Sequence, residues 1–309
     1  MSKTLIVIAG PTAAGKTALA IQIAKHFKTE IISADSRQFY REMNIGTAKP
    51  SKVELAAVRH HLIDSHSVKD LFSVGDFEKE VISLLEKLFK THDQVVLVGG
   101  SGLFINAVCN GFDELPVASE ETRNKLNQLL SEKGIEHLQE NLKKADPLYY
   151  AEVDINNPQR LIRALEVFET TGKPFSSFRT KIPKKRNFNI IKLAISPDRE
   201  KLYEQINLRV DQMLENGLLK EVEGLKEYRH LNALNTVGYS EVFEYLDGNL
   251  SEEEAIDKIK QNTRRFAKRQ LTWFKKSEDI HWFDPQESGA ILNYLDDAIS
   301  SLRNGDQKN

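Results

Sequence analysis

The segment at residues 10–17 constrains the fold more than any other part of the chain. It reads Gly-Pro-Thr-Ala-Ala-Gly-Lys-Thr and matches the phosphate-loop pattern G-x-x-x-x-G-K-[ST] without a mismatch. The preceding residues 4–9 are apolar and β-branched, and Leu19, Ile23 and Phe27 follow at helical spacing. The pattern therefore predicts a loop between a buried parallel strand and a helix, and with it an α/β fold with a parallel sheet.

Such a loop binds phosphate through its backbone amides and the start of the following helix. Lys16 can reach a terminal phosphate, and the Thr17 hydroxyl can hold Mg²⁺. We expect the whole loop to take part: Gly10, Pro11, Thr12, Ala13, Ala14, Gly15, Lys16 and Thr17. The motif predicts a phosphorylated ligand, and it does not by itself predict nucleotide hydrolysis. The next apolar strand, residues 95–98, ends in Gly-Gly-Ser-Gly without a carboxylate, and a guanine-reading Asn-Lys-x-Asp is absent.

A carboxylate stands at the end of the second predicted strand, residues 30–34. In open α/β sheets ligands lie beyond the carboxyl ends of the strands, so Asp35 is expected near the phosphate loop. It is a candidate general base. An N-cap Asp that begins the next helix is an equally good interpretation of its position.

The length of 309 residues suggests two domains, or one domain with a large insertion. Residues 113–186 are rich in helical spacing, with Leu126, Leu129 and Leu130 followed by Leu138 and Leu142. We expect a helical insertion there, within a core made of residues 1–112 and 187–309. The alternative is that this region simply continues the core.

Cys109 is the only cysteine, which excludes an internal disulfide and a multi-cysteine zinc site. No apolar run approaches the 18 or so residues of a membrane helix. The chain is therefore expected in the cytoplasm and away from membranes. A monomer is expected as well. His60, His61, His66 and Asp64 are expected to pack or hydrogen-bond, with a metal site as the alternative.

The formal net charge of −2 averages over uneven segments. Residues 258–276 hold eight Lys or Arg and no acidic residue, and residues 170–197 hold seven and none. Helical spacing over 252–274 places Lys260, Arg264 and Lys268 on one face, and an apolar row that includes Phe266 on another. Near-neutrality therefore argues only against indiscriminate nucleic-acid binding and leaves room for one basic face.

Several segments together make the chain resemble the tRNA dimethylallyltransferase family. They follow family order across most of the chain: residues 10–17, Asp35-Ser36-x-Gln38-x-Tyr40, 44–50, 60–64, 98–103, 157–166, 237–239 and 267–274. The phosphate loop alone is unspecific, whereas the ordered set is highly specific. Eukaryotic relatives carry a C-terminal Cys/His zinc finger, which a single cysteine excludes, so the resemblance is to the bacterial form.

The resemblance implies a fold and a reaction. The fold is a P-loop NTPase-like core with a helical insertion that contacts tRNA. The reaction moves a dimethylallyl group from dimethylallyl diphosphate to N6 of adenosine 37, in tRNAs that read codons starting with U. Mg²⁺ on Thr17 would assist, Asp35 would accept the N6 proton or orient the amine, and Thr12 and Arg209 would stabilise the leaving diphosphate. From its position alone, Arg209 is expected to be a solvated helix charge.

The same resemblance implies a surface for the anticodon stem-loop. Its residues are Asp35, Ser36, Arg37, Gln38, Ser101, Arg123, Gln159, Arg160, Leu161, Ile162, Arg163, Gly238, Lys268, Arg269 and Lys275. One departure is Ser240, where the family often has a basic residue, and it puts one tRNA contact in doubt.

Two rival functions remain open at this stage. A small-molecule kinase would share the core, but it would need a second Mg²⁺ carboxylate and an Arg-rich lid. A nucleotide-gated RNA-binding protein would share the RNA segments, but it would have no need of Asp35 beside the phosphate loop.

Overall fold

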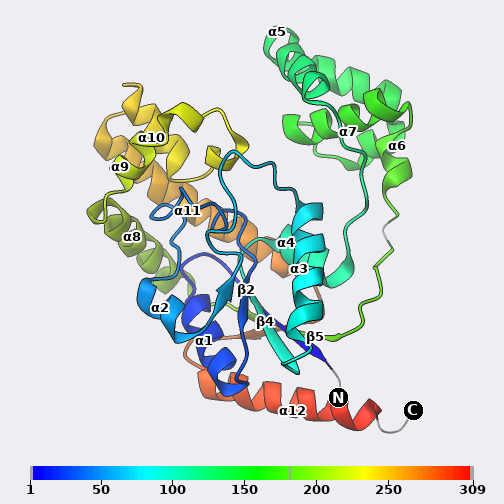
Figure 1. Ribbon diagram of the computed structural model, residues 1–309. Coiled ribbons are helices and arrows are strands. Elements are labelled where there is room, and N and C mark those ends of the chain that lie inside the picture. Colours follow the sequence, from blue (N-terminus) through cyan, green and yellow to red (C-terminus); the bar gives the residue numbers. More distant parts are fainter. Residues whose placement is uncertain (1–2, 181, 307–309) are drawn as a thin grey trace. The chain divides into compact units, whose positions relative to one another are not determined.

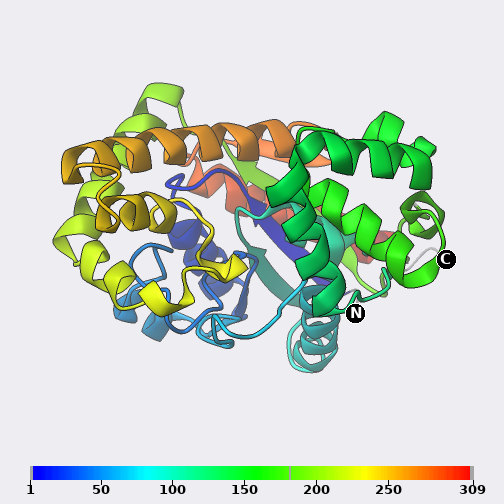
Figure 2. The same cartoon turned by 90° about the horizontal axis from the view of Figure 1, so that it is seen from above.

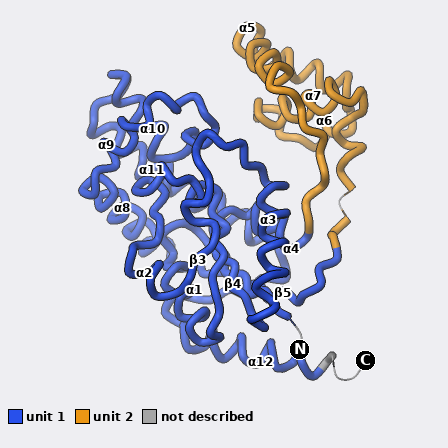
Figure 3. Tube along the Cα trace, viewed as in Figure 1, with its two compact units in different colours: residues 1–110, 185–309 blue, residues 111–184 orange. Residues whose placement is uncertain are grey.

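The computed structural model describes residues 3–180 and 182–306. The chain forms two compact units (Figure 3), which are described separately: unit 1 is residues 1–110 and 185–309, and unit 2 is residues 111–184. The insertion expected at 113–186 differs from unit 2 by two residues at each boundary.

Unit 1 is built on a parallel sheet of six strands in the order β3-β2-β4-β1-β5-β6, as far as the described residues show. The strands are β1 (Thr4–Ala9), β2 (Ile31–Ser33), β3 (His60–His61), β4 (Gln94–Val98), β5 (Asn189–Ile195) and β6 (Ile280–Phe283). β1 lies in the middle, with Leu5 opposite Val95 on β4 and Ile190 on β5. The predicted α/β class with a phosphate-loop core is confirmed.

The helices of unit 1 cover both faces of this sheet (Figure 1). They are α1 (Lys16–His26), α2 (Lys52–Ala57), α3 (Val74–Leu88), α4 (Gly102–Asn110), α8 (Arg199–Glu215), α9 (Leu218–Glu223), α10 (Tyr239–Leu246), α11 (Glu252–Phe274) and α12 (Ser288–Asp306), with 3₁₀ helices η2 (Lys226–Tyr228) and η3 (Asn232–Leu234).

Successive residues of β1 enter two different cores. Leu5 and Val7 pack with residues of α3 and α4, and Ile6 and Ile8 pack with residues of α1, α8 and α12. Both sides of the strand are therefore buried, which explains why its sequence is continuously apolar instead of alternating. This central strand ends at the phosphate loop, so the loop begins from a strand that is buried and paired on both sides.

α11 has the bounds that its sequence predicts, and it runs as one long helix, orange in Figure 2. A capping box begins this helix, because Ser251 accepts a hydrogen bond from the Glu254 amide while Glu254 accepts one from the Ser251 amide. The expected apolar row needs one correction. Of the expected row, Ile259, Gln270 and Phe274 are buried, but Phe266 is 38% exposed, and Ala267 takes its place in the buried stripe.

Unit 2 is helical and has a core of its own. It contains α5 (Glu120–Ala145), kinked at Gly134, then α6 (Pro147–Glu152), α7 (Pro158–Thr171) and the 3₁₀ helix η1 (Phe175–Phe178). Leu126, Leu138 and Leu142 of α5 pack against Leu161 and Leu165 of α7. The helical character expected for the insertion is therefore what this segment adopts.

Across the described residues, the longest helices are too polar to cross a lipid bilayer. Cys109 is buried, and burial raises the pKa of its thiol to about 11. A thiol of this kind is protonated and chemically inert at neutral pH.

Candidate active site

The phosphate loop leaves β1 through a backbone that only certain residues can adopt. The φ angles of Gly10, Ala13 and Gly15 are 143°, 63° and 83°. A Cβ on Gly10 would lie 2.8 Å from the carbonyl oxygen of Ile195, so the loop requires glycine where it passes β5. Gly15 is the N-cap of α1 and brings no capping side chain. The first amides of α1 therefore lack an intrahelical acceptor and can bind an anion.

Gln270 of α11 joins the phosphate loop to the loop that follows β4. Its Oε1 accepts a hydrogen bond from the Thr12 amide at 2.8 Å, and its Nε2 donates to the Gly100 carbonyl at 2.9 Å. A Cβ on Gly100 would lie 2.3 Å from this Nε2, and one on Gly102 would lie 2.2 Å from Cδ1 of Trp273. The glycines of residues 99–102 therefore allow α11 to lie against this loop.

Two cations lie together at the phosphate loop. Lys16 donates from Nζ to the Pro11 carbonyl at 2.5 Å, and its pKa is lowered to about 7 by burial and by the positive charge of Arg209, against an opposing effect of Asp35. Burial also lowers the pKa of Arg209, with Glu54 opposing. Arg209 is therefore not the solvated helix charge that its position alone predicts. Two cationic side chains brought together at a phosphate loop favour a polyanionic ligand.

Asp35 follows β2 and lies near Lys16, as the electrostatic coupling between the two shows. Its Oδ1 accepts hydrogen bonds from the amides of Arg37 at 2.9 Å and Gln38 at 3.3 Å. The residues that follow form a turn and not a helix, so Asp35 caps a turn. Among the described residues Oδ2 has no hydrogen-bond partner, so one carboxylate oxygen is held while the other is free for a ligand.

The neighbours of Asp35 are fixed by the adjoining loops. Ser36 donates its amide to Oγ of Ser101 at 3.0 Å. Arg37 is largely buried, burial lowers its pKa, and its Nη2 donates to the Asn232 carbonyl at 3.2 Å. Ser36, Arg37 and Ser101, which were expected to contact tRNA, thus lie together beside Asp35.

The side-chain amide of Gln38 is hydrogen-bonded within the protein. Its Nε2 donates to the carbonyls of Thr47 at 3.2 Å and Ala48 at 3.1 Å, and its Oε1 accepts from Oγ of Ser33 at 3.2 Å. The residue was expected to contact tRNA. In this structure its side chain holds the loop at residues 44–48 against the Asp35 turn.

In unit 2, two of the arginines expected to contact tRNA share one buried carboxylate. Arg123 of α5 makes a two-point contact with Glu166 of α7, with Nε–Oε1 at 2.5 Å and Nη2–Oε2 at 3.0 Å. Arg163 donates to the same carboxylate at 3.2 Å and to the Pro116 carbonyl at 3.0 Å. Glu166 is fully buried, and its arginine partners lower its pKa although desolvation opposes them. The guanidinium groups are therefore held in place by a residue that cannot itself reach a ligand.

The remaining predicted residues of α7 divide by exposure. Gln159 and Arg160 are exposed, at the start of the helix. Leu161 and Ile162, at 0% and 7% exposure, pack in the core of unit 2. Their side chains cannot form part of an exposed RNA-binding surface, and we assign both residues to packing.

The basic residues of α11 fall into two groups, those that are exposed and those that contact α8. Lys268, Arg269 and Lys275 are exposed. Lys260 pairs with Asp211 at 2.6 Å, and Arg264 donates to Oδ1 of Asn207 at 2.6 Å, both on α8. The expected common basic face of Lys260, Arg264 and Lys268 is therefore wrong as a free surface, because α8 occupies the first two.

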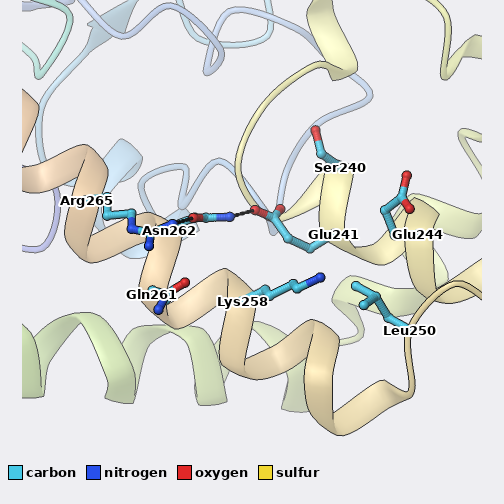
Figure 4. Close-up of a pocket in the computed structure, with 8 residues that line it drawn as sticks. All are labelled: Ser240, Glu241, Glu244, Leu250, Lys258, Gln261, Asn262 and Arg265. Atoms are coloured by element: carbon cyan, nitrogen blue, oxygen red, sulfur yellow. Dashed lines mark hydrogen bonds between the residues drawn. The ribbon is translucent and has the colours of Figure 1, made fainter.

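Gly238 is the N-cap of α10, with a φ of 95°. Next to it, Ser240 lines a pocket of about 330 Å³ between α10 and α11 (Figure 4). Lys258 and Arg265 line the same pocket, opposite Glu241 and Glu244. The Ser240 hydroxyl donates to the Thr236 carbonyl at 3.2 Å, so the cations of this pocket come from α11, and the pocket as a whole is balanced in charge.

The histidines do not converge on a metal site. His61 contacts Glu30 at 2.5 Å, whereas His60 bonds the Val58 carbonyl through Nδ1 at 2.8 Å. Within residues 3–180 and 182–306, no group of three or more His, Cys, Asp or Glu side chains could hold a metal. A magnesium ion at the phosphate loop would therefore depend on Thr17 together with ligand oxygens.

Two residues, Gln270 in unit 1 and Glu166 in unit 2, have roles that the sequence analysis did not predict. Gln270 was predicted to lie on the apolar face of a helix. A single amide on such a face is the one sequence signal that could have indicated its contacts with backbone groups. Glu166 is the last residue of the family-matching segment 157–166. Its spacing of three residues from Arg163 on one helix is the sequence signal that could have indicated an ion pair.

Comparison with known proteins supports one family. The family model described as IPP transferase matches residues 38–277. A tRNA dimethylallyltransferase of Christiangramia forsetii is 53% identical over 302 residues, which cover 97% of this chain and 100% of the relative. The tRNA dimethylallyltransferase 1 of Bacteroides thetaiotaomicron is 49% identical over 292 residues, which cover 94% and 95% of the two chains.

Solved structures agree with these relatives. The full-length tRNA isopentenylpyrophosphate transferase of Bacillus halodurans matches with a TM-score of 0.72 and 38% identity, covering 98% of this chain and 99% of that one. A eukaryotic dimethylallyltransferase acting on tRNA matches with a TM-score of 0.75 and 29% identity, covering 92% of this chain and 74% of the other. The likeness therefore includes both units.

Proposed function

Because the chain belongs to the IPP transferase family, we propose that it is a tRNA dimethylallyltransferase. It transfers a dimethylallyl group from dimethylallyl diphosphate to N6 of adenosine 37, in tRNAs that read codons starting with U. The products are N6-(dimethylallyl)adenosine and diphosphate. One observation carries this proposal: the cations Lys16 and Arg209 lie at a phosphate loop together with Asp35, a carboxylate with one free oxygen. This combination suits an anionic leaving group and a weakly nucleophilic amine.

The leaving group is the first requirement. The bond between C1 of the dimethylallyl group and the bridging oxygen breaks, and diphosphate departs with the electron pair. Lys16, Arg209 and the loop amides stabilise the developing negative charge, and the Thr12 hydroxyl donates to the bridging oxygen. When bound, Mg²⁺ would add positive charge at the diphosphate, with the Thr17 hydroxyl as a ligand and phosphate and water oxygens as the others.

The nucleophile is the second requirement. The lone pair of N6 is delocalised into the adenine ring, so the amine must be oriented as well as deprotonated. Asp35 does both: Oδ1 is held by the amides of Arg37 and Gln38, and Oδ2 accepts the proton that N6 loses as the N6–C1 bond forms. A positioned base of this kind contributes on the order of 10²–10⁴ in rate.

The target adenosine must leave its stack to reach a buried allyl group. The RNA partner is the anticodon stem-loop, which binds through phosphate and base contacts. Arg123, Arg160 and Arg163 supply these contacts from unit 2, and Lys268 and Lys275 supply them from α11. We further propose that the enzyme acts as a monomer in the cytoplasm.

One assay tests the proposal. The protein is incubated with dimethylallyl diphosphate labelled in the allyl group, Mg²⁺ and unmodified tRNA. Label should appear in the tRNA at adenosine 37, and not in a control tRNA with guanosine at that position. Turnover of ATP without transfer of label would instead favour a kinase and contradict the proposal.

A further inference from the structure

Glu221, on the short helix α9, has all four of its carboxylate acceptor positions occupied. Its Oε2 accepts from the amides of Asn44 at 2.9 Å and Ile45 at 2.8 Å. Its Oε1 accepts from the Gly46 amide at 3.0 Å and from the Tyr239 hydroxyl at 2.6 Å. A single side chain thus binds three successive backbone amides of a loop that is about 175 residues distant in the sequence.

The loop at residues 44–48 has a backbone conformation and a close contact that need support. Ala48 has a φ of 49°, a left-handed conformation that is unfavourable for a residue with a Cβ. Gly46 lies against the buried ring of Tyr239, and a Cβ there would come within 2.5 Å of Cε2. Burial and the neighbouring Glu221 raise the pKa of Tyr239, so its hydroxyl remains a donor to that carboxylate.

The same loop connects to the catalytic carboxylate through Gln38. The carbonyls of Thr47 and Ala48 accept from Nε2 of Gln38, at 3.2 and 3.1 Å. The backbone amide of Gln38 in turn donates to Oδ1 of Asp35 at 3.3 Å. A chain of hydrogen bonds therefore runs from Glu221 through the loop and Gln38 to Asp35, entirely within unit 1.

We propose that Glu221 is a positioning residue for Asp35. Its charge fixes the 44–48 loop, the loop carbonyls fix Gln38, and Gln38 fixes the carboxylate that meets the N6 amine. Glu221 contacts neither the phosphate loop nor the predicted RNA-binding residues of α11 in the hydrogen bonds above. This inference rests on the proposed function for its catalytic consequence, although the structural coupling stands apart from it.

Glu221→Gln tests the proposal, because an amide at this position removes the charge and turns a donor toward the loop amides. The matched control is Glu223→Gln, an exposed carboxylate on the same helix. We expect Glu221→Gln to lower kcat by about 10- to 100-fold, as displacement by about 1 Å can do, with an unchanged KM for dimethylallyl diphosphate. Tyr239→Phe, which removes one of the four donors, should have a smaller effect in the same direction.

A double-mutant cycle separates positioning from simple stabilisation. In an Asp35→Ala background, Glu221→Gln should cause no further loss of kcat, because the group through which it acts is already gone. Losses that multiply in the double variant would overturn the proposal, since Glu221 would then act independently of Asp35.

Hydrogen–deuterium exchange of the full chain supplies a readout that needs no activity. Glu221→Gln should accelerate exchange of the amides at residues 44–46 and also at residues 37–38, whereas Glu223→Gln should change neither. Faster exchange confined to residues 44–46 would refute the coupling to Asp35. Failure of the proposed function would show differently, as a wild-type protein that transfers no label to tRNA.

Discussion

Diphosphate binding should depend steeply on pH because of Lys16. Its pKa falls from 10.5 to about 7 in the ligand-free protein, mainly through burial and then through Arg209. A bound diphosphate places negative charge beside the ammonium and raises that pKa again. Because the protonated side chain is the form that binds, affinity should be level below pH 7. Above pH 7 it should fall about tenfold per pH unit, until the pH reaches the pKa of the complex.

The size of the effect follows from the pKa of about 7. Lys16 is half protonated at pH 7 and about 1% protonated at pH 9, so affinity should fall roughly 50-fold between these two pH values. That ratio corresponds to roughly 2 kcal/mol of binding free energy. At pH 8 about 0.9 proton should be taken up for each ligand bound. The ligand contributes little over this range, because its last phosphate pKa lies near 6.

Isothermal titration calorimetry with dimethylallyl diphosphate, in the absence of tRNA, measures both quantities. Titrations at pH 7, 8 and 9 give the affinities, and buffers with different ionisation enthalpies give the number of protons taken up. Lys16→Arg is the control, because a guanidinium stays charged throughout and should flatten the pH dependence. Equal wild-type affinities at pH 7 and pH 9 would refute the reasoning, and so would an unchanged slope in Lys16→Arg.

Three further changes have expected outcomes. Asp35→Ala should reduce transfer by the order of 10²–10⁴ that such a base contributes, leaving a measurable residual rate, while dimethylallyl diphosphate still binds. Near-normal turnover would remove Asp35 from the mechanism. Gln270→Ala leaves the Thr12 amide and the Gly100 carbonyl without their partner, so chemical denaturation should show a loss of about 1–3 kcal/mol. Lys268→Gln should reduce the salt slope of tRNA binding by about 0.7–0.9, as one lost phosphate contact does. Lys260→Gln should leave that slope unchanged, because Lys260 pairs with Asp211, and equal slopes in the two variants would contradict the division of α11.

Elements with strong local signals could be predicted from the sequence. β1 is a continuous apolar run ahead of a phosphate loop, and α11 begins at a capping box, so the bounds predicted for both are those of the structure. β6 and α12 were not predicted. β6 has four residues at the edge of the sheet, and its His281 is exposed, so it lacks the continuous apolar run that marks the central strands.

The candidate site could be predicted only where its residues lie next to the loops that follow strands. Asp35 could be predicted because it follows a strand. The burial of Arg209 beside Lys16 could not, because helical spacing does not show which face of a helix another element covers. The same limit explains Lys260 and Arg264, whose basic face is real but is covered by α8.

Glu221 and Glu166 each contact partners that are far away in the sequence. Those partners carry no sequence pattern that would predict the contact. Glu221 binds backbone amides, which every residue except proline possesses. The side chains of residues 44–46 therefore do not reveal this contact. Glu166 is fully buried between two arginines, one of them on another helix. In both cases desolvating the carboxylate is offset by several hydrogen bonds, and removing it would leave those donors unpaired. The phosphate loop thus predicts what this protein binds, whereas Glu166 and Glu221 hold in place the groups proposed to contact RNA and to act in catalysis.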